Sequence, residues 1–385
     1  MRFREDWTYT EERLELVAGS MAQLLAKIRP RISSRLIDGI GWDRLLERTS
    51  ELTAALGSFP FGFEIPLHDA RRVADFGVTL VGGSRTAAGY QDRQRSGSAG
   101  RSTARLAELL DETDREESLL RKVVGRKMLL EFDIDSEPGC VRPDPGVFLY
   151  PVDDALAGGR ERLRELNVVH DAVVRAGSWV PDHAERRELE RLYLVMPPDT
   201  LIKAFGTFPS RKRTMRTAVA GFKTARDVET FLVRTGWPGQ AKSVGSILSF
   251  FEDRGAFAYL GLHFDITGNG VGPKLGLSFF AREQDWLKDI RFWRALIDGV
   301  GERGYARSDK LEELAGRSTG STTLIDRSGP IKLVHGIHHI KLAITGGQVE
   351  EAKAYIFFLM MCMRPKGGGG PGQMAANRRS EAGGN

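Results

Sequence analysis

The chain has 385 residues, of which 41% are hydrophobic and 28% charged, and its formal net charge is +5. This is ordinary globular composition. The mildly basic balance fits a nucleic-acid binder and equally fits a pocket for a phosphorylated ligand, so charge alone excludes neither class. Length alone allows two or three domains, or one large barrel.

The cysteine content and the termini bear on the compartment. Two cysteines, Cys140 and Cys362, are too few for a disulfide framework or a cysteine-based zinc site, so we expect a reducing, cytoplasmic environment. Residues 1–10 lack the apolar core of a signal peptide. The longest apolar run, residues 355–363, is about half the length of a membrane span, so we expect no membrane partner.

Along the chain, two helical stretches are repeatedly followed by two alternating strands. In the first unit, apolar residues at helical spacing predict helices over residues 10–28 and 34–56. A hairpin follows, with strands expected at residues 61–67 and 75–80. Residues 82–102 are rich in Gly, Ser, Arg and Gln, and we predict a mobile loop there.

Four further units repeat this pattern. Helices are expected at residues 103–124, 156–176, 183–195, 226–235, 240–251, 283–300 and 308–314. Strands are expected at residues 127–135, 146–150, 201–208, 214–222, 259–266, 274–279, 334–344 and 352–359. The turn Thr267-Gly268-Asn269-Gly270 is a strong hairpin signal. Alternation does not assign the faces of the third hairpin.

The last hairpin shows the alternation best, because strand side chains point to opposite faces with period 2. Its polar face is expected to carry His335, Ile337, His339 and Lys341 on one strand and Lys353, Tyr355 and Phe357 on the other. The opposite, apolar face is expected to carry Val334, His338, Ile340, Leu342 and Ile344, with Ala354, Ile356 and Phe358. An apolar face suits packing under helices, and an enclosed polar face is what the lumen of a wide barrel requires.

Five hairpins joined by helices predict an α+β fold of about ten antiparallel strands, closed or nearly closed into a barrel with an outer layer of helices. Closure removes unpaired sheet edges, and ten strands leave room for a ligand. We expect one domain over residues 1–363 and a disordered Gly-rich tail over 364–385. An open α+β sheet, or two small sheets in two domains, is the alternative.

The repeated helix-helix-strand-strand unit resembles the ABBA, or PT-barrel, aromatic prenyltransferases over residues 10–363. Lys353-Ala354-Tyr355 is similar to the Lys-x-Tyr elements on barrel strands of the indole prenyltransferases, and Phe63-Glu64 lies where that family has a catalytic glutamate. Lys274-Leu275-Gly276 departs from the pattern because it lacks the tyrosine. The resemblance implies a transferase of natural-product biosynthesis that moves a prenyl group from an allylic diphosphate onto an aromatic acceptor, either a small molecule or a peptide side chain.

Prenyl transfer requires cations and hydroxyls around the departing diphosphate, aromatic faces around the allylic cation, and exclusion of water. We expect Glu64 to act as a base or to orient the acceptor, and His339 or His263 to act as a hydrogen-bonding group or proton shuttle. The candidate substrate-binding residues are Tyr259, His263, Lys274, Lys341, Lys353 and Tyr355. Alternatively, the lysines are rim residues that reach solvent or neutralise Glu131 and Asp133.

We expect no cofactor. Glu131 and Asp133 are candidate ligands for a magnesium ion, although a salt-bridge network is the alternative. His335, His338 and His339 would need a β-bulge to converge on a metal. The Gly268–Gly272 run lies between two strands and precedes no helix, so it predicts a turn and not a nucleotide loop.

Two other function classes stay open. The same barrel could serve as a non-catalytic protein that binds a peptide or metabolite of a biosynthetic pathway. A weak nucleic-acid binder is the third class, suggested by the mild positive charge and the basic turn at residues 210–213. No RNA-binding aromatic motif, helix-turn-helix or zinc-finger spacing accompanies that turn, so we do not expect a nucleic-acid partner.

Overall fold

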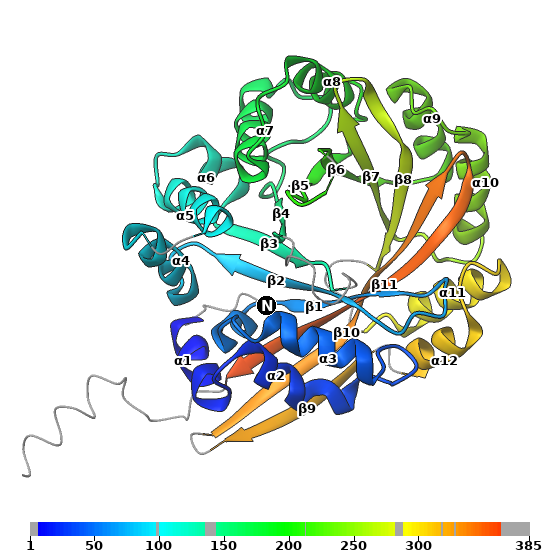
Figure 1. The fold of residues 1–385 in the computed structure, drawn as a ribbon. Coiled ribbons are helices and arrows are strands. Elements are labelled where there is room, and N and C mark those ends of the chain that lie inside the picture. Colours follow the sequence, from blue (N-terminus) through cyan, green and yellow to red (C-terminus); the bar gives the residue numbers. More distant parts are fainter. Residues whose placement is uncertain are drawn as a thin grey trace, which may run out of the picture.

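A closed antiparallel barrel forms the centre of the molecule, and helices surround it (Figure 1). The computed structural model describes residues 7–97, 100–134, 144–211, 213–281, 288–316, 319–326 and 329–362. The barrel strands are β1 (Phe61–Pro66), β2 (Asp75–Val81), β3 (Lys127–Phe132), β4 (Gly146–Leu149), β5 (Leu201–Thr207), β6 (Met215–Phe222), β7 (Tyr259–Thr267), β8 (Gly270–Phe280), β10 (Gly329–Thr345) and β11 (Gln348–Cys362).

Each barrel strand pairs with its neighbour in chain order, and β11 pairs with β1. That last pairing closes the sheet and leaves no unpaired edge in the ring. The predicted fold, ten antiparallel strands in five hairpins under an outer layer of helices, is therefore confirmed. The predicted disordered tail over 364–385 lies outside the described residues.

An eleventh strand, β9 (Thr319–Asp326), was not predicted from the sequence. It pairs with the first half of β10, from Gly329 to Gly336, and so extends the sheet beyond the ring. The long strands β10 and β11 continue past the barrel and carry this extension (Figure 1).

Helices follow one another around the outside of the barrel in chain order (Figure 1). They are α1 (Trp7–Val17), α2 (Met21–Ile28), α3 (Gly39–Thr49), α4 (Arg85–Arg95), α5 (Arg101–Asp114), α6 (Leu119–Val124), α7 (Leu163–Gly177), α8 (His183–Leu194), α9 (Ala225–Thr235), α10 (Ala241–Glu252), α11 (Ile290–Glu302) and α12 (Ser308–Gly316). Short 3-10 turns lie at η1 (Arg29–Arg31) and η2 (Ala54–Ser58). Among the residues the structure describes, no helix combines the length and the apolar character needed to cross a bilayer.

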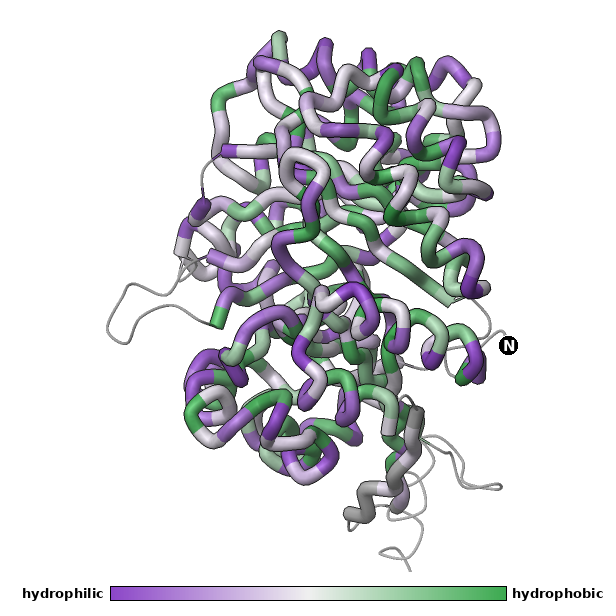
Figure 2. Tube along the Cα trace, turned by 90° about the vertical axis from the view of Figure 1, so that its right-hand side faces the viewer, coloured by the Kyte–Doolittle hydropathy of each residue, from purple (hydrophilic) through white to green (hydrophobic). Residues whose placement is uncertain are grey.

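The hydrophobic core lies between the outer face of the barrel and the inner faces of the helices. Outward strand residues such as Ile65, Phe264 and Leu342 are fully buried there, as are Phe231 and Trp293 of the helices. Burial of one such side chain contributes about 1.5–3 kcal/mol. Hydrophobic and hydrophilic residues alternate along strands and helices instead of separating into zones (Figure 2), and this alternation leaves the inner face of the barrel for polar groups.

The prediction of a mobile loop over residues 82–102 is wrong, because α4 occupies Arg85–Arg95. Ser84 caps this helix, since its side chain accepts a hydrogen bond from the Ala87 N–H. Glu11, from α1, accepts from the N–H groups of Arg85 and Thr86 at 3.1 and 3.2 Å. A cap supplied from 74 residues away in the chain is invisible to local composition.

A β-bulge in β10 corrects the predicted faces of the last hairpin. Ile337 pairs with Ile356 and His339 pairs with Tyr355, so His338 is an extra residue. Alternation therefore changes phase at this point: Ile337 and Ile340 are both fully buried in the outer core. The ring of His335 packs against Phe358 on that same outer side. The predictions that Ile337 and His335 share a face with His339, and that His338 points away from it, are wrong.

Candidate active site

The barrel encloses a cavity of about 720 Å³, lined by residues from all ten strands of the ring. This volume is typical of sites for small molecules. Each of the eight candidate residues lines it: Glu64, Tyr259, His263, Lys274, His339, Lys341, Lys353 and Tyr355. We call this cavity the chamber. The candidate residues predicted from the sequence thus come from five strands and meet at one enclosed space.

One register row runs around more than half of the chamber. Residues paired directly across antiparallel strands lie side by side on one face, about 5 Å apart. The row connects β7, β8, β10, β11, β1 and β2 through Tyr259, Phe280, His339, Tyr355, Glu64 and Asp75. The sequence of side chains along it changes from aromatic rings to carboxylates.

The first four residues of this row form a continuous aromatic wall. Ring centroids are 5.9 Å apart for Tyr259 and Phe280, and 4.7 Å apart for Phe280 and His339. His339 and Tyr355 stack at 3.8 Å, with 14° between the ring planes. Aromatic faces attract cations through the ring quadrupole. The wall can therefore stabilise a carbocation.

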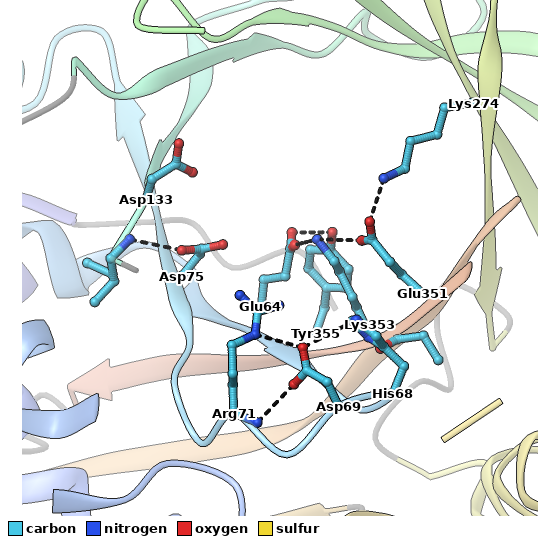
Figure 3. A network of polar contacts seen from close by, with 12 residues as sticks. Glu64, His68, Asp69, Arg71, Asp75, Asp133, Lys274, Glu351, Lys353 and Tyr355 are labelled. Atoms are coloured by element: carbon cyan, nitrogen blue, oxygen red, sulfur yellow. Dashed lines mark hydrogen bonds and ion pairs between the residues drawn. The ribbon is translucent and has the colours of Figure 1, made fainter. Parts of the chain in front are cut away.

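Glu64 is held by two donors at the end of the aromatic wall (Figure 3). Lys353 Nζ lies 2.6 Å from Glu64 Oε1, and the Tyr355 hydroxyl donates to Glu64 Oε2. Burial alone would raise the pKa of Glu64, but the charges of Lys353 and Lys341 and the two hydrogen bonds lower it to about 2. Glu64 is therefore a carboxylate at neutral pH and has little tendency to take up a proton.

A second ion pair lies beside the first (Figure 3). Lys274 Nζ is 2.5 Å from Glu351 Oε1, and Lys353 Nζ is 3.3 Å from Glu351 Oε2. Burial opposes ionisation of Glu351, but these two lysines lower its pKa to about 2. Lys274 and Lys353 are thus compensated by carboxylates.

Lys341 differs from the other lysines of the chamber. It lies opposite Lys353 in the register, two pairs along from His339 and Tyr355 and therefore on the same face. Within the described part of the chain, no hydrogen bond or ion pair engages its Nζ. Burial, followed by the charge of Arg216, lowers the pKa of Lys341 to about 8. A buried lysine with no carboxylate in contact with its ammonium group is well suited to bind an anion.

Gly276 stands where a Lys-x-Tyr element would have its tyrosine, and it leaves space for the side chain of Lys341. A Cβ atom on Gly276 would lie 2.6 Å from Lys341 Cε and 3.1 Å from His263 Cβ. The aliphatic part of Lys341 therefore crosses the position that a side chain on β8 would fill. The departure from the family pattern is thus linked to the placement of Lys341 in the chamber.

His263 is neutral in this environment. Its Nε2 lies 2.9 Å from the Ser278 hydroxyl. Burial, then the charges of Lys341 and Arg216, lowers the pKa of His263 well below its usual value. His263 can accept or donate a hydrogen bond to a ligand, but it does not supply positive charge at neutral pH.

Acidic groups lie on the side of the chamber formed by β1 to β3. Burial, and next the charge of Glu64, raises the pKa values of Asp75 and Glu131 to about 7. Asp75 Oδ1 accepts a hydrogen bond from the Ile134 N–H at 2.9 Å. Asp133 pairs with Arg211, whose Nε lies 2.9 Å from Oδ2. The described residues contain no group of three or more His, Cys, Asp or Glu side chains arranged to hold a metal ion.

Sequence reasoning missed Arg216 of β6, which pairs with Asp265 of β7 at 3.1 Å inside the chamber. Burial lowers the pKa of Arg216, but the charge of Asp265, its hydrogen bond and the charge of Glu131 together raise it above the usual value. An irregularity between Ile202 and Ala204 breaks the alternation of the preceding strand. The signal that could have found Arg216 is its spacing from the small residues Ala218 and Ala220, which line the same side.

Apolar side chains fill part of the barrel near β3 to β5. Leu129, Phe148 and Phe208 form a cluster separate from the outer core, and the two phenylalanine rings meet edge to face at 5.4 Å. The Arg211 guanidinium lies 3.7 Å from the Phe208 ring centroid. A Cβ on Gly206 would lie 2.0 Å from the Phe148 ring, so only glycine leaves room for that ring. We call these three side chains the plug.

No protein-family model matches the chain, and no curated protein matches it. Several solved structures are similar to it. A 5-dimethylallyltryptophan synthase from Streptomyces coelicolor is 16% identical, covers 91% of this chain and 96% of its own, and has a TM-score of 0.43. A 6-dimethylallyltryptophan synthase from Micromonospora olivasterospora, in complex with DMASPP and Trp, is 12% identical with 80% and 82% coverage and a TM-score of 0.44. The NotF prenyltransferase is 10% identical with 92% and 96% coverage and a TM-score of 0.48.

The resemblance to the ABBA prenyltransferases is confirmed as one of architecture: a closed ring of ten antiparallel strands with helices outside. Likenesses as distant as these carry no evidence about activity. The chamber and its own residues therefore support the functional conclusions.

Proposed function

We propose that the protein is a transferase that moves a prenyl group from an allylic diphosphate onto an aromatic acceptor inside the chamber. The observation that carries the proposal is the position of Lys341, a cation without a carboxylate partner, in the register row next to a wall of stacked rings. An anion bound at Lys341 would place its attached hydrocarbon within reach of that wall.

Ionisation of an allylic diphosphate breaks a C–O bond and leaves negative charge on the diphosphate. Lys341 would carry that charge, and Lys353, opposite it in the register, would assist; Lys274 joins Lys353 through their shared ion pairs with Glu351. Charge-assisted hydrogen bonds of this kind contribute about 1.5–3 kcal/mol each. The rings of Tyr259, Phe280 and Tyr355 would face the allylic cation, and the closed barrel would keep bulk water from capturing it.

Glu64 would orient the acceptor. A carboxylate has about four lone-pair sites, and Lys353 and Tyr355 use two of those on Glu64. The others can accept an N–H or O–H of an aromatic acceptor. This role suits Glu64 because Lys353 and Tyr355 hold the carboxylate in place and keep it ionised.

A second candidate function is non-catalytic binding of a peptide or metabolite, and the charge balance of the chamber favours it. Six basic and six acidic side chains occur among the described lining residues. Four of the basic ones are paired with carboxylates of the lining, so most of the positive charge is already neutralised. A near-neutral chamber would accept a zwitterionic ligand as readily as an anion.

The turn at residues 210–213 offers little to a nucleic acid. Arg211 binds Asp133, and Arg213 donates to the Val180 carbonyl at 2.6 Å and contacts Glu185. These two guanidinium groups are therefore used within the protein.

Transfer is tested by incubating the purified protein with dimethylallyl diphosphate and, separately, tryptophan, tyrosine and short peptides that contain them. We expect mass spectrometry to detect an acceptor that has gained one dimethylallyl group. Lys341→Met should remove the product, whereas Lys332→Met, on an exposed part of the same strand, should not. Tight binding of an acceptor without product, in every pairing, would favour the second function.

A further inference from the structure

The bulge in β10 brings two histidines together at the chamber wall. In a β-bulge two residues oppose one residue of the partner strand, and bulges of this kind often re-aim side chains next to active sites. Here His338 and His339 oppose Tyr355, and both line the chamber. Their Nδ1 atoms are 2.9 Å apart, which is the separation of a hydrogen bond.

Neighbouring rings fix this pair in place. His338 stacks on Phe357 at 4.3 Å with 7° between the planes, and His339 stacks on Tyr355. Phe280 contacts both histidines. Stacking therefore holds each imidazole in its plane, and a half-turn of either ring within that plane would lose the Nδ1–Nδ1 hydrogen bond.

Both histidines are neutral at physiological pH. Burial lowers the pKa of His338 to about 4, and burial together with the nearby His338 lowers the pKa of His339 well below its usual value. A neutral imidazole has one N–H and one bare nitrogen. A hydrogen bond between two Nδ1 atoms thus requires that one ring carries its proton on Nδ1 and the other on Nε2.

We propose that His338 is a positioning residue that accepts a hydrogen bond from His339 Nδ1–H and so leaves His339 Nε2 bare, as a proton acceptor at the aromatic wall. The opposite arrangement would leave His339 with an Nε2–H, and no hydrogen bond joins His339 Nε2 to a described residue. A buried donor without an acceptor is rarer than a buried acceptor without a donor. The tautomer with the bare Nε2 is therefore the favoured one.

This inference rests on the proposed function, because it gives His339 a step in prenyl transfer. The allylic C–O bond breaks and its electron pair leaves with the diphosphate. A pair of ring electrons of the acceptor forms the new bond to the allylic carbon, and the acceptor ring becomes cationic. His339 Nε2 then takes the proton from the substituted ring atom, and the electrons of that bond restore the aromatic ring. The products are the prenylated acceptor, the diphosphate and an imidazolium.

Nitrogen-detected NMR of the full chain labelled with ¹⁵N-histidine tests the tautomer directly. We expect His339 to give the signature of a neutral ring protonated on Nδ1, and we expect His338→Phe to change it. An Nε2-protonated His339 in the unmodified protein would overturn the proposal. This measurement needs no turnover. A wrong tautomer would refute only the inference about His338, whereas the absence of any prenylated product would refute the proposed function.

Kinetics test the positioning role. His338→Phe should lower kcat by about 100-fold, the scale of a lost proton acceptor, and leave the KM for the diphosphate nearly unchanged. His338→Asn, whose side-chain oxygen can occupy the place of Nδ1, should retain most of the activity. The matched control is His335→Phe, on the same strand but on the outer face against Phe358. Equal losses in His338→Phe and His338→Asn would overturn the proposal, because a purely structural role would not distinguish them.

Discussion

Neutralisation of Glu64 probes the polar network at the end of the aromatic wall. The pKa of Glu64 falls from 4.5 to about 2 in the folded protein, which corresponds to about 3 kcal/mol in favour of folding when the group is ionised. The side chain is only 16% exposed, so solvent screens this contribution little. Glu64→Gln should therefore destabilise the protein at pH 7.

Glu64→Gln should cost less than the full contribution of about 3 kcal/mol, because Glu64 also raises the pKa values of Asp75 and Glu131. Loss of its charge relieves those two groups and offsets part of the cost. We expect a net loss of about 1–3 kcal/mol in the free energy of unfolding. Glu350→Gln, at an exposed position of β11, should change it by less than about 0.5 kcal/mol.

Urea denaturation followed by circular dichroism, at several pH values, measures this difference. Since the folded pKa lies below the unfolded one, the contribution of Glu64 is fully present above pH 4.5 and decreases as pH falls toward 2. The gap between the unmodified protein and Glu64→Gln should narrow accordingly below pH 4.5. A gap of the same size at pH 7 and at pH 3, or no gap at pH 7, would refute the electrostatic reasoning.

Three other predictions concern the chamber. Lys341→Met should weaken binding of dimethylallyl diphosphate at least tenfold in a calorimetric titration, because it removes a buried ammonium group that has no described carboxylate in contact with it. Unchanged affinity would exclude Lys341 as the anion site. Asp75→Asn should stabilise the protein by about 1–3 kcal/mol at pH 8 and much less at pH 4. The folded pKa of Asp75 is raised to about 7, so the carboxyl destabilises the folded protein increasingly as pH rises from the unfolded pKa of 3.8 through 7. Thermal melts at both pH values measure the effect, and a destabilised variant at pH 8 would contradict the reasoning. Phe208→Ala should enlarge the chamber and cost about 3–5 kcal/mol in unfolding free energy; a crystal structure whose cavity stays near 720 Å³ would show that the plug does not limit the chamber.

Much of the chamber follows from period-2 alternation in single strands. Lys353, Tyr355, His263 and Glu64 point inward because each sits between apolar neighbours that pack under helices. Such patterns are local, and the hydrophobic effect enforces them strongly. The same logic predicted closure, since five hairpins with one apolar face each have few other ways to bury it.

What the sequence did not reveal depends on contacts between distant residues. The β10 bulge adds one residue, and it changes the phase of the alternation on either side of His338. The helix α4 depends on a cap from Glu11, and β9 depends on pairing with β10. The ion pair of Arg216 with Asp265 requires the register between β7 and β6, and local alternation did not orient β6.

Calorimetric titration of the unmodified protein with dimethylallyl diphosphate tests the central claim most directly, namely that this barrel holds an allylic diphosphate beside stacked rings. We predict saturable binding at a single site, weakened by salt and by Lys341→Met but not by Lys332→Met. The absence of heat at millimolar ligand, or equal binding in both variants, would contradict it.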